Sequence, residues 1–150
     1  MRVFANLEEF VAAKGEELGT SQWHTITQDQ VNLFADATGD HQWIHVDADL
    51  AAKGPFGTTI AHGYLTLSLI PMLGKEIYQV DGLTMGINYG LNKARFPNTV
   101  KVGAKVRGKA DLVDVTDVPG GKQPVVRYTI EIEGEDKPAC VAETVVRLMS

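Results

Sequence analysis

Several features that mark particular protein classes are scarce in this 150-residue sequence. Its one cysteine, Cys140, cannot form an internal disulfide, and disulfide scaffolds and four-cysteine zinc modules are therefore excluded. The longest apolar stretch, from Leu65 to Leu73, contains polar residues and a proline, and it is far shorter than the ~20 residues that span a membrane. Basic residues are outnumbered, 14 against 19 acidic ones. We therefore expect neither a nucleic-acid nor a membrane partner.

Motifs of three large enzyme classes are also missing. The sequence has no GxGxxG and no Gly-x-Ser-x-Gly, and the glycine-rich stretch 54–57 lacks the Gly-Lys-Ser/Thr ending of a phosphate loop. The first ten residues include acids where a signal peptide has its apolar run, so we expect a cytoplasmic protein. With 44% hydrophobic residues, a chain of this length can bury a core, and we predict a single domain over residues 1–150.

Residues 1–82 have mainly helical signals. A capping residue followed three positions later by Glu or Gln predicts helices that start after Asn6 and after Thr27. Gly39 is placed to end the second of these helices, and Asp47 predicts a further short helix before Gly54-Pro55. The stretch 20–27 favours a short strand.

The stretch from His62 to Leu73 is apolar on nearly every side, which is typical of a core helix covered by other elements. Residues 83–150 can supply the cover, because their apolar residues recur with a period of two in four segments, 85–92, 105–112, 126–133 and 140–148. Turn signals at 118–121 and 133–136 leave only short connections, which imply antiparallel pairing. The sequence therefore predicts an α+β fold, with a curled antiparallel sheet around one apolar helix.

The chemistry is expected in the polar stretch that joins these two parts. Asp40 and His45 lie five residues apart, and their side chains converge only if the backbone turns, which Gly39 allows. A carboxylate and an imidazole aimed at one water form a general acid/base pair. The spacing alone is more typical of Asp40 as a turn or capping residue and His45 as a structural histidine.

Two further groups in this region have alternative interpretations. Gly63, in the first turn of the apolar helix, could offer its N–H to a substrate oxygen, or it could only permit close packing beneath the sheet. His41 and His45 have the i, i+4 spacing of a helical metal pair, with His62 or Asp47 as a third ligand. Because the stretch is poor in helix formers and has no intervening glutamate, we expect no metal site.

Two motifs together resemble the MaoC-like, (R)-specific enoyl-CoA hydratases of the hotdog fold. The first is FADATGD, residues 34–40, followed by Ile44-His45. The second is IAHG, residues 60–63, which opens the apolar helix. The resemblance extends from about Asp29 to the C-terminus.

The resemblance implies a five-stranded antiparallel sheet wrapped around one long central helix, about His62 to Leu73. The segment from Ala94 to Pro97 looks like the family's entrance to a strand that would begin near Val100. Single hotdog chains of the family work as homodimers that hold the acyl group in a tunnel, so the resemblance implies a homodimer here.

Carried over by position, Asp40 and His45 match the family's catalytic pair, and Gly63 matches the amide that binds the thioester oxygen. The implied reaction is the reversible syn hydration of trans-2-enoyl thioesters to (R)-3-hydroxyacyl thioesters. The thioester is carried by coenzyme A or an acyl carrier, and the resemblance implies no separate cofactor. Members commonly carry Asn-Pro between the pair, where this chain has Gln42 and Trp43.

Three residues are candidates for the acyl pocket. Trp43 could line the tunnel or hold the loop by packing, and Tyr64 and Ser68 lie in the first turns of the apolar helix. Ser68 is also a candidate for the polar helix side chain that assists the pair in some members, although its hydroxyl could equally bond only to its own helix.

Two other functions stay open. A hotdog acyl-CoA thioesterase would use a carboxylate from the core helix, but residues 64–73 contain no acid. A non-catalytic acyl-thioester-binding hotdog subunit would depend on a partner chain for its chemistry, and the presence of both Asp40 and His45 argues against that.

Overall fold

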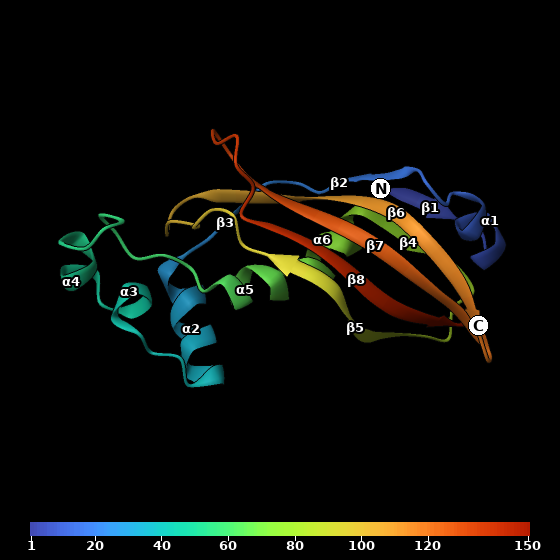
Figure 1. The fold of residues 1–150 in the computed structure, drawn as a ribbon, viewed down its shortest axis with the longest axis horizontal. Helices are drawn as coiled ribbons and strands as arrows, with labels where there is room; N and C mark the ends of the chain where they lie inside the picture. The colour runs from blue at the N-terminus through green and yellow to red at the C-terminus, as the bar shows by residue number, and fades with distance from the viewer.

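The structure, a computed structural model, describes residues 1–150 (Figure 1). The elements in chain order are β1 (Arg2–Phe4), α1 (Leu7–Ala12), β2 (Glu17–Thr20), β3 (His24–Thr25), α2 (Gln28–Thr38), α3 (Trp43–Val46), α4 (Ala48–Ala52), α5 (Gly63–Ser68), α6 (Ile70–Ile77), β4 (Tyr78–Val80), β5 (Met85–Arg95), β6 (Lys105–Val118), β7 (Gly121–Ile132) and β8 (Cys140–Met149). Every helix precedes residue 78, and the four long strands follow residue 84.

The main sheet is antiparallel and confirms the predicted α+β fold. Its strand order is β2-β6-β7-β8-β5, and β3 also pairs with β6, so that the sheet has six strands rather than five. A two-residue turn, Pro119-Gly120, joins β6 to β7, with Val118 opposite Gly121. Strands β1 and β4 form a separate parallel pair that the sequence pattern did not predict.

The central helical segment lies against the inner face of this sheet, but it is not one helix. Helix α5 ends at Ser68, and α6 continues from Ile70 to Ile77, beyond the predicted end at Leu73. The division follows from Pro71, which has no N–H to donate to the turn before it. Leu69 between the two helices keeps a helical backbone, with φ −77° and ψ −14°.

Helix α6 packs closely on the sheet. Leu73 and Ile77 are almost fully buried in a cluster that includes Val106, Ala110 and Ile130 from β6 and β7. A Cβ at Gly74 would lie 2.6 Å from the hydroxyl oxygen of Tyr128, so only glycine fits at this contact. Cys140 of β8 is also buried in this core.

The helical segment is covered on one side only. Tyr64, Ser68, Met72 and Lys75 form an exposed stripe along it, with Tyr64 70% exposed. Strand β5 beside this stripe is the edge of the sheet, and its apolar side chains are also exposed, namely Met85, Ile87, Tyr89 and Leu91. Residues 62–73 are apolar on nearly every side, but other elements of this chain cover only one side of the segment.

The helix caps of the first part follow the sequence signals. The side chains of Asn6, Thr27 and Asp47 each accept a hydrogen bond from a backbone N–H in the first turn of the helix that follows. Gly39 ends α2 in the left-handed conformation, with φ 82°.

Two predicted strands differ from the structure. The stretch 20–27 is divided between the end of β2 and the short β3. No strand begins near Val100, because residues 96–104 form a loop that contains Pro97 and a left-handed Gly103, and β6 starts at Lys105. A single bridge between Ile60 and Lys101 connects this loop to the segment before α5.

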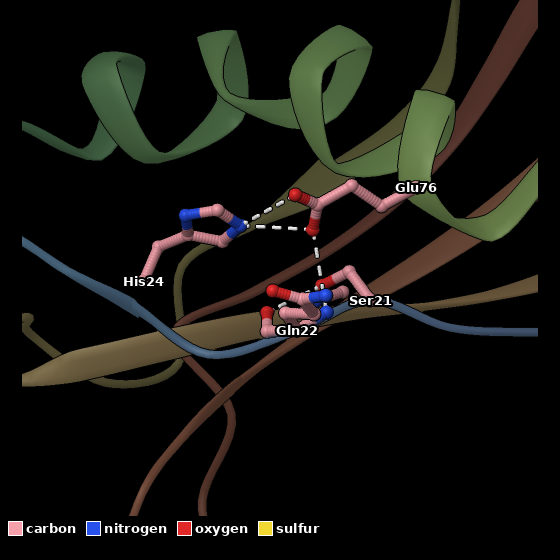
Figure 2. A network of polar contacts seen from close by, with 5 residues as sticks. Ser21, Gln22, His24 and Glu76 are labelled. Atoms are coloured by element: carbon pink, nitrogen blue, oxygen red, sulfur yellow. Dashed lines mark hydrogen bonds and ion pairs between the residues drawn. The ribbon is translucent and has the colours of Figure 1, made fainter. Parts of the chain in front are cut away.

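A polar contact fastens the β2–β3 connection to the far end of α6 (Figure 2). His24 Nε2 lies 2.8 and 3.0 Å from the two carboxylate oxygens of Glu76, and the Gln22 N–H donates to the same carboxylate. The Ser21 hydroxyl accepts from the Gly108 N–H of β6. The contact therefore links the sheet edge to the central helix.

None of the helices in the structure combines the length and the apolar character that a membrane span needs.

Candidate active site

Helices α2, α3 and α4 gather at one end of the molecule, beyond the end of the main sheet (Figure 1). The left-handed Gly39 turns the chain after α2, and the single turn α3 returns to the start of α2. The Gln28 side-chain amide donates to the carbonyl oxygen of His45 at 2.8 Å, which holds α3 against α2. The sequence pattern did not predict α3.

This fold-back brings Asp40 and His45 together with a third residue. One carboxylate oxygen of Asp40 and one ring nitrogen each of His45 and His62 lie within 4.8 Å of one another. His45 and His62 are buried, whereas Asp40 is exposed. The contact of the Asp40 carboxylate within the chain is a long hydrogen bond of 3.4 Å from the Gln42 N–H. The carboxylate is thus open to solvent beside two buried imidazoles.

The tautomer of His45 follows from its hydrogen bond. Its Nδ1 lies 2.7 Å from the carbonyl oxygen of Ile60, which can only accept, so Nδ1 carries the proton. Nε2 therefore has a free lone pair and is able to take a proton from a bound water.

Two residues outside the predicted site fix His45. Gln28 holds its carbonyl, and the Thr59 hydroxyl donates to the Gln28 side-chain oxygen at 2.6 Å. Ile60, next to Thr59, holds the imidazole ring. Gln28 carries no sequence signal for this role, since the first position of a helix usually faces solvent, and its partners lie 17 and 31 residues away.

The arrangement of the two imidazoles bears on metal binding. The His45 and His62 rings are stacked, with centroids 3.9 Å apart and planes inclined by 25°. A metal ion lies in the plane of each imidazole that binds it, about 2.0–2.1 Å from the nitrogen. Because the His45 and His62 ring planes are nearly parallel, they do not intersect at a point within metal–ligand distance of both rings. The nitrogen lone pairs of the two rings therefore do not point at one common metal ion. His41 binds Asp36 rather than joining the cluster.

The pair of His41 and Asp36 lies at the exposed side of the site. The hydrogen bond that His41 Nε2 donates to the Asp36 carboxylate raises the pKa of His41 above its ordinary value of 6.5. The negative charges of Asp36 and Asp40 act in the same direction.

Gly63 borders the same cavity as His45. This cavity of about 120 Å³ lies between the start of α5 and the loop at Phe96. The Gly63 N–H is one of the first-turn amides that have no acceptor within the helix. A Cβ at this position would lie 3.1 Å from the Phe96 ring, so the close packing of α5 on Phe96 also favours glycine here. The two interpretations of Gly63 are therefore compatible.

A groove runs along the uncovered side of the central helices, between α5–α6 and strands β5 and β8. It consists of two adjoining hollows of about 460 Å³ each, which share Ile70, Pro71, Asn88 and Thr144. Ser68 lines this groove, and its hydroxyl donates to the Tyr64 carbonyl. Neither Trp43 nor Tyr64 lines it. Trp43 lies over Gly54, and Tyr64 meets Phe96 edge to face.

The sequence of residues 9–134 matches the family described as MaoC like domain. The chain belongs to the MaoC-like dehydratase family. This match covers most of the chain and confirms the resemblance carried by the motifs at residues 34–45 and 60–63.

Two curated proteins resemble this chain over most of its length. It is 57% identical over 151 residues to 3-hydroxyacyl-thioester dehydratase Z of Mycobacterium tuberculosis, with all of both chains covered. It is 47% identical over 132 residues to nodulation protein N of Rhizobium leguminosarum bv. viciae, which covers 85% of this chain and 81% of that protein.

Solved structures share the fold of this MaoC-like chain. The R-hydratase PhaJ1 from Pseudomonas aeruginosa superposes with a TM-score of 0.74 at 23% identity, covering 91% of this chain and 82% of that one. The (R)-hydratase from A. caviae gives a TM-score of 0.74 at 24% identity, covering 90% and 96%. At these identities the likeness establishes the hotdog fold.

Proposed function

We propose that this chain catalyses the reversible hydration of trans-2-enoyl thioesters to (R)-3-hydroxyacyl thioesters, with Asp40 and His45 as the catalytic pair. The observation that carries the proposal is the convergence of the Asp40 carboxylate with the His45 imidazole, beside a cavity that His45 shares with Gly63. The names of the dehydratase and hydratases that the chain resembles support the same reaction.

Each group has a distinct part in this reaction. The Gly63 N–H donates to the thioester carbonyl oxygen and stabilises the negative charge that develops there, which makes C3 electrophilic. Asp40 and His45 hold one water between them. The water gives a proton to His45 Nε2 and adds its hydroxide to C3, and that proton is delivered to C2 on the same face. Water is thereby added without a net change in the protein.

The substrate is proposed to be an acyl thioester of coenzyme A or of a carrier, with no further cofactor, and the chain is proposed to act in the cytoplasm. The stacked His45 and His62 rings support chemistry without a metal ion. Dialysis against EDTA should leave the hydratase rate unchanged. A loss of activity that Zn²⁺ or Mg²⁺ restores would contradict this part of the proposal.

We also propose that the chain forms a homodimer through β5 and the exposed stripe of α5 and α6. Strand β5 has a neighbour on one side only, yet it exposes Ile87 and Tyr89 by 44% and 60%. Edge strands that remain in solvent are normally protected by charges or bends, and an exposed apolar edge is a pairing surface. A second copy presents the same edge and can pair with it antiparallel.

The oligomeric state tests this surface. Light scattering of the eluting protein should give twice the 16.3 kDa chain mass. The Ile87→Lys substitution should shift the protein toward the monomer, whereas the matched change Val113→Lys, on β6 away from this edge, should not. A wild-type monomer at micromolar concentration would contradict the proposal.

A thioesterase function has less support. The central helices extend far enough to include an acid, Glu76, but its carboxylate is held by His24 and by the Gln22 N–H at the far end of α6 (Figure 2). Glu76 lies thirteen residues beyond Gly63, which corresponds to about 20 Å along a helix. No carboxylate of α5 or α6 is therefore near the cavity at Gly63.

One assay separates these functions. The purified protein is mixed with crotonyl-CoA and with longer enoyl-CoA substrates, while the ultraviolet absorbance of the conjugated thioester and the release of free thiol are followed in parallel. Hydration removes the conjugation without releasing thiol, and this is the expected result. Thiol release would indicate a thioesterase, and binding without turnover would indicate an acyl-binding subunit.

A further inference from the structure

His62 contains a buried polar atom without a partner. Its Nδ1 is the one buried side-chain nitrogen or oxygen in the structure that makes no hydrogen bond, and the residue is only 2% exposed. Such atoms are rare in folded proteins and costly, because the group has lost its water. An apolar ring of similar size would fill the same space without this cost. The contribution of His62 must therefore come from its other nitrogen or from its ring.

The other nitrogen holds the backbone of Asp40. His62 Nε2 donates to the Asp40 carbonyl oxygen at 3.0 Å, across 22 residues of sequence. The other hydrogen bonds of residues 39–42 reach partners at most five positions away. Residues 39–42 belong to no helix or strand. The bond from His62 therefore connects the Asp40 loop to the start of α5, where Gly63 lies.

The ring of His62 lies against the second member of the pair. It stacks on the His45 ring at a centroid distance of 3.9 Å, and the Phe34 ring lies 4.9 Å from it. His45 is fixed at its backbone by Gln28 and at Nδ1 by Ile60. The stack adds a third restraint, on the tilt of the His45 ring.

We infer that His62 is a positioning residue, which fixes Asp40 and His45 relative to each other and to Gly63. This inference rests on the proposed function for its effect on catalysis. His62 itself transfers no proton, since its Nε2–H is engaged with the Asp40 carbonyl and its Nδ1 is buried. His62 sets the distance between the Asp40 carboxylate in the loop and the buried His45 imidazole beside it. Without His62, the Asp40 loop has only local contacts.

Two substitutions separate the hydrogen bond from the ring. His62→Phe keeps an aromatic ring on His45 and removes the donor to Asp40. His62→Gln removes the ring but can place a side-chain N–H near the position of Nε2. Because a misplacement of about 1 Å can cost about 100-fold in rate, His62→Phe should lower kcat about 10- to 100-fold with little change in KM. His62→Gln should recover most of that loss.

His24→Phe is the matched control. It removes a histidine side chain that also bonds to a distant segment, but at the other end of the central helices. Its kcat should equal that of the wild type, and circular dichroism and thermal melting should show that all three variants are folded. Wild-type kcat in His62→Phe would overturn the inference, and so would equal losses in His62→Phe and His62→Gln.

A measurement without substrate separates this inference from the proposed function. In ¹⁵N-labelled protein, His62→Phe should shift or broaden the backbone amide signals of residues 39–42, and His62→Gln should leave them close to wild type. Unchanged signals in His62→Phe would overturn the positioning role even in an active enzyme. If the wild type hydrates no enoyl thioester, the proposed function fails, and these amide signals still decide whether His62 holds the Asp40 loop.

Discussion

The inner strands of the sheet and the loop that carries Asp40 are held in place by different interactions. In β6, β7 and β8, alternate side chains are buried against α6, and backbone ladders join the strands along their whole length. In residues 39–62, side chains bind backbone carbonyls instead, as Gln28 binds that of His45 and His62 binds that of Asp40. The frame of the fold, meaning the sheet and α6, is thus held mainly by apolar burial, which has no specific direction. A few directed hydrogen bonds position the catalytic residues.

The largest expected effect is a loss of activity on substitution of the catalytic pair. Asp40→Asn and His45→Ala should each lower kcat by about 10²–10⁴-fold, the usual effect of losing a positioned acid or base. The melting temperature of Asp40→Asn should stay close to wild type, because the carboxylate is exposed and weakly bonded. Steady-state kinetics and thermal melting measure the two effects. Full activity in either variant would remove that residue from the pair.

Leu73→Ala should show the opposite pattern. Leu73 is fully buried between α6 and the sheet, and truncation there leaves a cavity, with an expected loss of about 2–5 kcal/mol in the free energy of unfolding. The kcat of the folded fraction should remain close to wild type. Urea denaturation, with activity measured well below the transition, tests this. A large loss of kcat in fully folded protein would show that the frame and the site are not separable.

Gln28→Leu lies at the boundary between the two regions and should affect both. The substitution leaves the Thr59 hydroxyl and the His45 carbonyl without their side-chain partner, which is expected to cost about 1–3 kcal/mol of stability. It should also lower kcat, because the His45 backbone is no longer held to α2. Thr59→Val, which removes one bond of the same network, is the milder control. An effect on stability without a loss of kcat would show that Gln28 does not help to position His45.

The smallest effect concerns Cys140, on the core face of β8. Burial raises the pKa of its thiol to about 11, so the folded protein favours the protonated form. Because the unfolded thiol loses its proton at lower pH, this contribution to stability is complete in neutral solution and is lost as the pH rises through about 11. A thiol reagent at pH 8 should react slowly with native protein and rapidly in denaturant. Rapid reaction in both states would contradict the buried placement.

The frame could be predicted from the sequence because its signals are local and repeated. Alternation along 105–112 and 140–148 defines β6 and β8, since the residues on one face of each strand are buried in the core. The break at Leu69 could have been found from Pro71. Strand β5 is harder to predict, because two irregularities in its pairing with β8 shift the register, and nearly all of its residues are exposed within this chain.

The site was predictable only in part. Gly39 marks the turn that brings Asp40 back, and the sequence motifs named Asp40, His45 and Gly63. The sequence gives no sign of the contacts that determine their geometry, because Gln28, Thr59 and His62 reach partners 17 to 31 residues away. The sequence pattern indicates His62 as part of the IAHG motif and as a possible metal ligand. Its bond to a backbone carbonyl depends on where the Asp40 loop meets the start of α5.

The most direct test of the account is hydration of crotonyl-CoA in D₂O, with the product analysed by NMR and on a chiral column. If Asp40 and His45 add one water to a single face, the product is (R)-3-hydroxybutyryl-CoA with one deuterium at C2, on the same face as the new hydroxyl. His45→Ala should form this product at a rate reduced by about 10²–10⁴-fold. A racemic or (S) product, addition to opposite faces, or an unreduced rate in His45→Ala would contradict the account.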